Sequence, residues 1–448
     1  MKAYKYILIF PLLLSISTFG QVPVITTPQP TTPSRSIIVG RTNNRNNPTP
    51  DIPTFPTNNR NQQQLNIYEQ DRLTVERMNM MQRQNQFEEE LASYSSVQFD
   101  LPSWSGAQGT EHYYQTAGKL IDMLNGKAPL NLKDAVFAVE NTYFEGLLDE
   151  KIYDEAISQM ATIARLKAGQ DGLNWNNPTT KNLMLYRVMA DTLRVKFPMR
   201  ERASTSFPMQ YDFEDFRGGE QDFSKLFITK LLSSHKGQCH SLPLLYLILC
   251  EKVGAEASLA FSPPQHSYIK FKDRNNNWHN LELTQGMMTT DAFIIGSGFI
   301  NAAAIKHGVY MQPPQSKKQV IAHCLSDLAS GYIHKYGYDK FVIQCIDSVL
   351  AYAPTNTSAL AMKSNYHSIH LSYAAHQVGS PPPDTLKVHY PDIYKLFEQR
   401  NNVYRRLDEI GFVEIPKEVY ESWLNSANEE KERREHDIRY KSALRLIE

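Results

Sequence analysis

Cys239, His266 and Glu282 are the side chains of this sequence that together could carry out covalent chemistry. A cysteine attacks carbonyl groups as its thiolate, a neighbouring histidine takes up the thiol proton, and a carboxylate orients the imidazole and stabilises its positive charge. The three residues are distant along the chain, so this chemistry requires secondary-structure elements that bring them together. Nucleophilic thiol chemistry is therefore the first functional hypothesis.

A helix is predicted to begin beside Cys239. Pro243 is tolerated in the first turn of a helix, where its missing N–H would have no partner, and Gly254 is a typical C-terminal stop. Because residues 244–250 are almost continuously apolar, we expect this helix to be central and buried. A cysteine at its N-terminus would face unpaired N–H groups and the positive end of the helix dipole, and both favour the thiolate.

A β-hairpin is predicted to follow this helix. A short apolar strand is expected at 257–261, and the segments 266–271 and 278–284 flank a polar turn at 273–277. Two such runs joined by a short polar turn are typical of antiparallel strands. The predicted hairpin contains both the histidine and the carboxylate of the hypothesis.

The expected register of this hairpin places His266 and Glu282 on one face. If Lys272 pairs with Trp278, the two residues are diagonal neighbours, about 7 Å apart between Cα atoms and within side-chain reach. A shift of the pairing by two residues would place them directly opposite each other. Any shift that keeps this parity leaves them on the same face.

The same residues also have simpler interpretations. A free cysteine is usually a buried packing residue, His266 alone would be an ordinary strand-end histidine, and Glu282 alone would be a salt-bridge partner. Cys250, Cys324 and Cys345 lie in apolar helical patterns, and all three are assigned to packing. A disulfide between Cys324 and Cys345 stays open. The sequence has neither Cys-x-x-Cys nor His-Glu-x-x-His spacing, so we predict no metal and no other cofactor.

At these positions the chain resembles the transglutaminase-like superfamily, which shares the papain-type core. Gly237-Gln238-Cys239 matches the Gly-Gln-Cys around the family's nucleophile, and His266 opens a strand as the family's histidine does. Trp278, followed by Glu282-Leu283-Thr284, stands where the family has Trp and then Asp-x-Thr. The resemblance covers about 223–300, which is less than a third of the chain.

The resemblance implies an α+β fold with a central helix packed on a small antiparallel sheet, embedded in mostly helical flanking regions. It also implies acyl transfer through a thioester on a protein or peptide substrate, with water (peptidase or amidase) or an amine (crosslinking) as acceptor. The implied catalytic residues are Cys239 as nucleophile, His266 as base and Glu282 as orienting acid, and the implied substrate-binding residues are Gln238, His240 and Trp278.

Two positions depart from the family pattern. His240 stands where many members have an aromatic residue, often Trp, and the third catalytic position holds Glu282 in place of Asp. Asn280 has the right parity to orient the histidine instead. The alternative function is therefore a catalytically inactive scaffold that keeps the fold and binds protein partners through the C-terminal helices.

The beginning of the chain predicts export. Lys2 and Lys5 precede the apolar run 6–16, and small residues follow at 17–20; this order is typical of a cleaved secretory signal and too short to span a bilayer. We therefore expect a secreted or periplasmic protein without an integral membrane segment after cleavage. The Pro-, Thr- and Asn-rich stretch from residue 21 to 64 is expected to be a disordered linker.

Composition narrows the choice of partners. The chain has 448 residues, 41% of them hydrophobic, which suffices for a large core in two to three domains. Its 47 Lys and Arg balance 47 Asp and Glu, so no basic face for nucleic acid is predicted.

Helical patterns dominate both flanks of the predicted core. Helices are expected at 65–93, within 111–169 and at 180–195, with Glu140 as a solvated edge residue. Around Gly337 the pattern predicts a helical hairpin, which resembles one tetratricopeptide-type unit. The predicted parts are the signal peptide (1–20), the linker (21–64), a helical N-terminal region (65–205), the transglutaminase-like core (206–312) and a helical C-terminal region (313–448).

Overall fold

The computed structural model describes residues 99–198, 201–212, 222–263, 266–295, 300–311 and 316–413, together with a few single helical positions before and after. The predicted signal peptide, the predicted linker and nearly all of the helix expected at 65–93 lie outside the described residues. From Phe99 onward the described residues belong to one compact unit, and the predicted regions 65–205, 206–312 and 313–448 contribute to the same hydrophobic core there.

Helices form the N-terminal part of this unit. They are α2 (Thr110–Leu124), α3 (Leu132–Tyr143), α4 (Glu150–Gln170) and α5 (Pro178–Ala190). Side chains of Asn131, Asp149 and Asn177 accept backbone N–H groups at the starts of α3, α4 and α5, as is usual for N-cap residues. The helices predicted within 111–169 are thus confirmed.

The helix predicted at 180–195 is wrong at its end. It stops at Ala190, and the chain continues as strand β1 (Leu193–Val195), which pairs antiparallel with β2 (Ser204–Ser206). Leu193 and Val195 are buried while Arg194 is exposed. This alternation has the period of a strand, not of a helix.

A central helix and a four-stranded sheet follow. Helix α7 (Ser241–Val253) is buried at every position from Ser241 to Cys250 and ends at Gly254, whose backbone is left-handed. It packs against α4, α5, α6 (Ile228–Ser234) and the sheet strands β5 and β6. The sheet is antiparallel in the order β5 (Ser258–Ser262), β6 (His266–Lys272), β7 (Trp278–Glu282), β8 (Met287–Thr289). The fold is therefore mixed α+β, mostly helical with small sheets.

Short elements connect the helices to this sheet. Strand β3 (Gln210–Tyr211) pairs parallel with β4 (Lys236–Gly237), directly before the nucleophile segment. The 3₁₀ helix η1 (Phe223–Leu226) precedes α6, and helices α8 (Asp291–Ile295) and α9 (Ala302–Lys306) follow the sheet.

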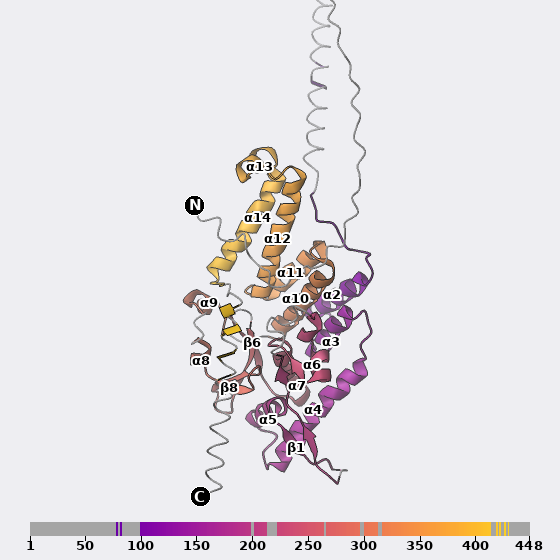
Figure 1. Ribbon diagram of the computed structural model, residues 1–448, viewed down its shortest axis with the longest axis vertical. Coiled ribbons are helices and arrows are strands. Elements are labelled where there is room, and N and C mark those ends of the chain that lie inside the picture. Colours follow the sequence, from indigo (N-terminus) through magenta and orange to yellow (C-terminus); the bar gives the residue numbers. More distant parts are fainter. Residues whose placement is uncertain are drawn as a thin grey trace, which may run out of the picture. The chain divides into compact units, whose positions relative to one another are not determined.

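The C-terminal helices pack on the N-terminal ones (Figure 1). They are α10 (Lys317–Tyr336), α11 (Lys340–Tyr352), α12 (Thr357–Gln377), α13 (Pro383–His389) and α14 (Pro391–Glu409). Helix α10 contacts α2, α3 and α11, and α12 contacts α14. The predicted helical hairpin is confirmed, with Gly337 at a positive φ of 92° between α10 and α11.

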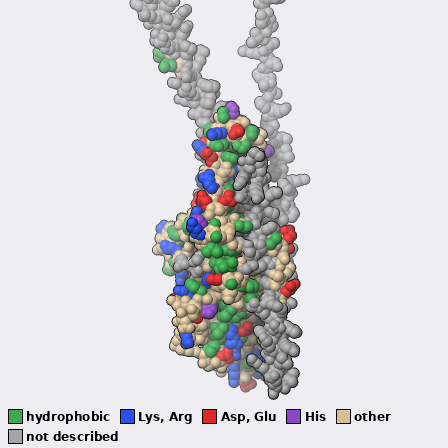
Figure 2. Space-filling view, turned by 90° about the vertical axis from the view of Figure 1, so that its left-hand side faces the viewer, with side chains coloured by type: hydrophobic (Ala, Val, Ile, Leu, Met, Phe, Trp, Pro, Cys, Tyr) green, Lys and Arg blue, Asp and Glu red, His purple; other side chains and the backbone are tan. Residues whose placement is uncertain are grey.

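Acidic and basic side chains are interspersed, with hydrophobic ones between them, on the face seen in Figure 2. No helix among the described residues combines the length and the apolar character needed to cross a lipid bilayer.

Candidate active site

Cys239 lies at the N-terminal end of α7, as predicted. His240 is the residue before the first helical turn, with φ −87° and ψ −56°. Close packing explains the glycine of the Gly-Gln-Cys motif, because a Cβ at Gly237 would lie 2.7 Å from Ser241 Oγ and 2.9 Å from a methyl carbon of Leu231. Cys239 as a whole residue is partly exposed, unlike the other three cysteines.

Gln238 supports the loop that carries the nucleophile. Its side chain is buried, and its Nε2 donates a hydrogen bond of 3.2 Å to the carbonyl oxygen of Asp212. Its backbone N–H donates to Ser241 Oγ at 3.0 Å. The amide that the resemblance implied for substrate binding is thus engaged inside the protein.

Two backbone donors remain beside the thiol. The helix begins with Leu242 N–H donating to the Gln238 carbonyl oxygen and Leu244 N–H to that of His240. Within the part of the chain that the structure describes, the N–H groups of Cys239 and His240 make no hydrogen bond. They are therefore available to a developing oxyanion next to the sulfur.

The hairpin has the predicted register. Lys272 pairs with Trp278, and Ile269 pairs with Leu281. An Asx-type turn closes it, because the Asp273 carboxylate accepts N–H groups within the turn. The same face therefore presents the first residue of β6 and the last residue of β7.

These two strand ends bring His266 and Glu282 into contact. The distance from His266 Nε2 to Glu282 Oε2 is 2.7 Å, and the two side chains are 0% and 1% exposed. Glu282 Oε1 also accepts the backbone N–H of Thr284 at 3.1 Å. Asn280, the alternative orienting residue, donates instead to Asp291 Oδ1 at 2.8 Å. The carboxylate and not the amide orients the imidazole.

The other side of the His266 ring faces the nucleophile. The imidazole and the Cys239 thiol interact, and this interaction raises the pKa of His266 and lowers that of Cys239. Since Nε2 is paired with Glu282, Nδ1 is the nitrogen left for sulfur. The hydroxyl of Ser267 donates to the Cys239 carbonyl oxygen and so fixes strand β6 to the start of α7. The structure brings all three predicted catalytic side chains together.

The electrostatics of this cluster favour an ion pair. Burial alone raises the pKa of the Cys239 thiol, but the hydrogen bond and charge of His266, helped by the charge of His240, outweigh burial and lower it. Burial alone lowers the pKa of His266, but the charge of Glu282 and the bond to the thiol raise it to about 10. Both shifts act in the same sense, because the lowered thiol pKa and the raised imidazole pKa each favour the thiolate–imidazolium pair over the neutral pair.

A second imidazole lies beside the nucleophile. His240 Nε2 is 3.1 Å from Asp327 Oδ2 on α10. Burial alone lowers the pKa of His240, and the carboxylate of Asp327 more than reverses this, raising it to about 9. A positive charge next to Cys239 therefore depends on a residue 87 positions further along the chain. No local sequence pattern indicated Asp327.

Trp278 is not brought to the thiol. It pairs with Lys272, six positions along β6 from His266, which corresponds to roughly 20 Å in a strand. The residue is 48% exposed, and its ring lies beneath the ammonium groups of Lys270 and Lys272, at 5.9 Å and 5.0 Å from the ring centre. This aromatic residue caps the turn end of the hairpin.

The other three cysteines are packing residues, as predicted. Cys250, Cys324 and Cys345 are at most 2% exposed, and burial raises the pKa of each thiol. Cys324 and Cys345 are free thiols, so the disulfide that the sequence left open is not formed. Cys239 alone of the four combines exposure with a lowered pKa.

Glu140 is not the solvated edge residue that the sequence predicted. Its side chain is 3% exposed, and its two carboxylate oxygens accept the N–H groups of Ile228 at 2.6 Å and Thr229 at 2.9 Å. Burial raises its pKa to about 7 in spite of these bonds. The carboxylate holds the start of α6, the helix that leads into β4 and Cys239.

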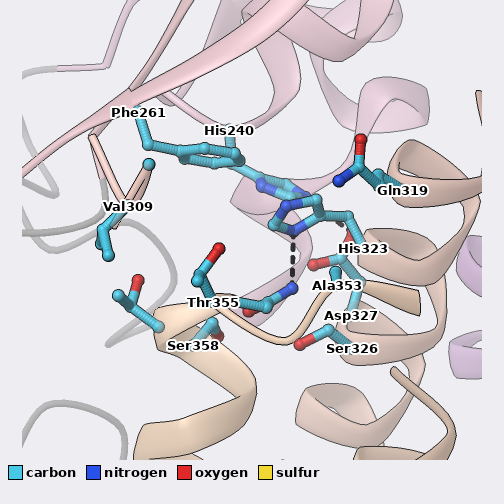
Figure 3. A pocket seen from close by; sticks show the side chains of 13 residues that line it. His240, Phe261, Val309, Gln319, His323, Ser326, Asp327, Ala353, Thr355 and Ser358 are labelled. Atoms are coloured by element: carbon cyan, nitrogen blue, oxygen red, sulfur yellow. Dashed lines mark hydrogen bonds and ion pairs between the residues drawn. The ribbon is translucent and has the colours of Figure 1, made fainter. Parts of the chain in front are cut away.

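A cavity of about 130 Å³ opens beside His240 (Figure 3). Its other walls come from the end of β5, the segment 308–309, helix α10 and the turn between α11 and α12. Phe261 and His323 pack ring against ring on one wall, with 4.7 Å between their centres. The C-terminal helices therefore border the site of the nucleophile.

Among the described residues, no group of three or more His, Cys, Asp or Glu is arranged to hold a metal ion. No family model matches the chain, and comparisons with curated proteins and with solved structures find no match either. The chemistry therefore has to be inferred from the geometry of the site itself.

Proposed function

We propose that this protein is an exported cysteine-dependent enzyme that transfers or hydrolyses acyl groups through a thioester on Cys239. The observation that carries the proposal is His266, whose ring interacts with the Cys239 thiol, so that its pKa is raised, and is hydrogen-bonded to a buried carboxylate. A histidine needed only for packing requires neither partner. The three side chains, the partial exposure of the Cys239 residue and two unengaged N–H groups together support acyl chemistry.

The first half of the proposed reaction forms the thioester. The Cys239 thiolate attacks the carbonyl carbon of an amide, and the N–H groups of Cys239 and His240 stabilise the negative charge on the carbonyl oxygen. The carbon–nitrogen bond then breaks, and the leaving amine takes a proton from the His266 imidazolium. Glu282 holds the ring in place and stabilises its charge throughout.

The second half releases the acyl group. His266, now neutral, accepts a proton from the acceptor, which is water in hydrolysis or a primary amine in crosslinking. The acceptor attacks the thioester carbon, the carbon–sulfur bond breaks, and the thiolate and imidazolium are restored. Protein or peptide amides are the proposed substrates, and membership of the transglutaminase-like superfamily with its papain-type core is part of the proposal.

Alkylation of the thiol tests this function directly. Native protein should react with iodoacetamide near neutral pH far faster than urea-unfolded protein, because only the folded state has the low-pKa thiol. Mass spectrometry should locate the label on Cys239. Cys239→Ala should abolish native labelling, whereas the matched variant Cys345→Ala should leave it unchanged.

Equal labelling rates in native and unfolded protein would overturn the proposed thiol chemistry. That result would favour the alternative function, a catalytically inactive scaffold. Fast native labelling on Cys250, Cys324 or Cys345 in place of Cys239 would also contradict the proposal.

A further inference from the structure

The cavity beside His240 is a candidate binding site for a substrate side chain that lies next to the acyl group attacked by Cys239. His240 directly follows the nucleophile, so their Cα atoms are about 3.8 Å apart. Phe261, His323 and the turn 353–358 form other parts of the wall. The cavity volume is about 130 Å³. This is room for a side chain.

His323 offers an N–H donor on this wall. Asn356 Oδ1 accepts the backbone N–H of Ala359 at the start of α12, which turns the amide nitrogen of Asn356 toward His323. That nitrogen donates to His323 Nδ1 at 3.2 Å (dashed in Figure 3). Burial lowers the pKa of His323 to about 4, so the ring is neutral and its proton is on Nε2. Among the described residues, nothing hydrogen-bonds to Nε2.

Further polar groups complete the lining. Gln319 Oε1 accepts the N–H of Ser316 at 3.2 Å, which leaves the Gln319 amide nitrogen on the side facing His323 (Figure 3). Ser326 is 2% exposed, and its hydroxyl has no hydrogen-bond partner among the described residues. The hydroxyl groups of Thr355 and Ser358 line the same space. A buried hydroxyl without a partner destabilises the empty pocket, and a polar ligand group relieves this.

The charges of the lining balance. The one carboxylate, Asp327, is paired with His240 at 3.1 Å, and His323 is neutral. A cationic side chain would find no free carboxylate, and an anionic one would lose its hydration without a free counter-charge. A hydrocarbon side chain would leave the donors unpaired. A carboxamide offers an oxygen for the N–H donors and an NH₂ group for the hydroxyl oxygens.

We propose that this cavity is a substrate subsite that binds the carboxamide side chain of a Gln or Asn residue next to the acyl group attacked by Cys239. Its place in a reaction rests on the proposed function, but binding of the side chain does not require a reactive thiol. The subsite gives the C-terminal helices a direct role, because α10 and the α11–α12 turn supply most of its polar groups.

Binding by full-length Cys239→Ala protein tests the subsite. The probes are peptides N-acetyl-X-glycine-methylamide, in which X is Gln, Asn, Glu, Met or Lys, and the readout is the NMR signal of the His323 ring in protein with isotope-labelled histidine. Saturable shifts are expected with the Gln or the Asn peptide, and the comparison between the two identifies the preferred length. Met, Glu and Lys peptides should bind at least about ten-fold more weakly, a difference of about 1.4 kcal/mol.

A matched pair of variants places the binding in this cavity. Ser326→Ala should weaken binding of the preferred peptide several-fold, because the variant lacks the hydroxyl that would hydrogen-bond to the carboxamide. Ser364→Ala removes another buried hydroxyl without a partner among the described residues, on α12 outside the cavity, and should leave binding unchanged. Neither variant should lower the unfolding midpoint of the parent protein, because each removes a buried hydroxyl that has no partner among the described residues.

The outcomes separate this inference from the proposed function. Equal shifts with the Met and Gln peptides, no saturable shift with either carboxamide peptide, or equal loss in both serine variants would overturn the subsite. Iodoacetamide is small and does not need to occupy the cavity in order to react with Cys239. Labelling of Cys239 in wild-type protein therefore tests the thiol chemistry on its own. Fast labelling with no peptide binding would reject only the subsite.

Discussion

His266 Nε2 and Glu282 Oε2 are 2.7 Å apart at adjoining ends of β6 and β7, and both side chains are buried. A buried ion pair is stable only when its remaining hydrogen-bonding positions are satisfied. Here the N–H of Thr284 donates to the second carboxylate oxygen of Glu282, and the imidazole of His266 also interacts with the Cys239 thiol. The carboxylate therefore controls the charge of the histidine and, through it, the charge of the sulfur.

Replacing this carboxylate should weaken the thiolate. In Glu282→Gln the amide can still accept a hydrogen bond but carries no charge, so the pKa of His266 should fall and that of Cys239 should rise. We expect iodoacetamide labelling of Cys239 at pH 7 to slow by at least about ten-fold, the effect of one pKa unit. The pH profile of labelling should shift to higher pH.

A carboxylate at the start of α8, beside the same sheet, provides the control. Asp291 is 53% exposed at its side chain and contacts Lys270 and Asn280, but not His266. Asp291→Asn should therefore leave the labelling rate within about two-fold of wild type. Unchanged labelling in Glu282→Gln would contradict the assigned role of Glu282.

The raised pKa of His266 predicts a pH-dependent stability. Its folded pKa of about 10 lies above the ordinary 6.5, so the protonated ring stabilises the folded state fully below pH 6.5, and this contribution is lost as the pH rises through about 10. Cys239 titrates with the opposite sign, since its folded pKa is lowered. Its contribution is present above the unfolded thiol pKa and lost as the pH falls.

Removing the thiol should expose the histidine contribution. We expect the unfolding free energy of Cys239→Ala, compared with that of Cys239→Ala/His266→Gln, to fall between pH 6.5 and 9 by up to about 1.4 kcal/mol per pH unit, the slope for one proton. Urea unfolding at several pH values measures this gap. A gap that stays constant or widens with rising pH would show that His266 is not held protonated.

The site was predictable where local signals determine geometry. Pro243 and Gly254 indicate the two ends of α7, and these place Cys239 at the helix start. The polar turn after Lys272 determines the strand register, and the period of two along a strand then puts His266 and Glu282 on one face. The contact between His266 and Glu282 therefore follows from local signals alone. The approach of Cys239 to His266 also requires that α7 packs on the sheet.

The remaining contacts come from parts of the chain that are distant in sequence. Glu140 caps α6 from 88 positions away, and Asp327 reaches His240 from α10. Apolar character alone does not indicate burial either, because Ile157 of α4 is buried whereas Ile152 of the same helix is 66% exposed. A single sequence does not reveal which helix faces which, so the cavity walls on α10 and the α11–α12 turn were not predictable.

Glu140 should matter for folding more than for chemistry. Glu140→Ala leaves two N–H groups at the start of α6 without their acceptor and should lower the unfolding free energy by about 1–3 kcal/mol. Because burial raises the folded pKa to about 7 from the ordinary 4.5, the wild type should lose stability as the pH rises from 4.5 to 7. Glu140→Gln, which keeps one acceptor oxygen and no charge, should be more stable than the alanine variant and lack this loss.

Asp327 is expected to act on the thiol from the C-terminal helices. In Asp327→Asn, His240 loses the carboxylate that keeps it charged, so labelling of Cys239 at pH 7 should slow by roughly three-fold. This difference from wild type should be smaller in high salt, because the pair is partly exposed. Asp347→Asn removes an exposed carboxylate from α11, where it pairs with Lys363, and should have no effect. Equal rates in both variants would mean that the charge on His240 does not reach the sulfur. A slower rate confined to Asp327→Asn would show that the C-terminal helices tune the nucleophile.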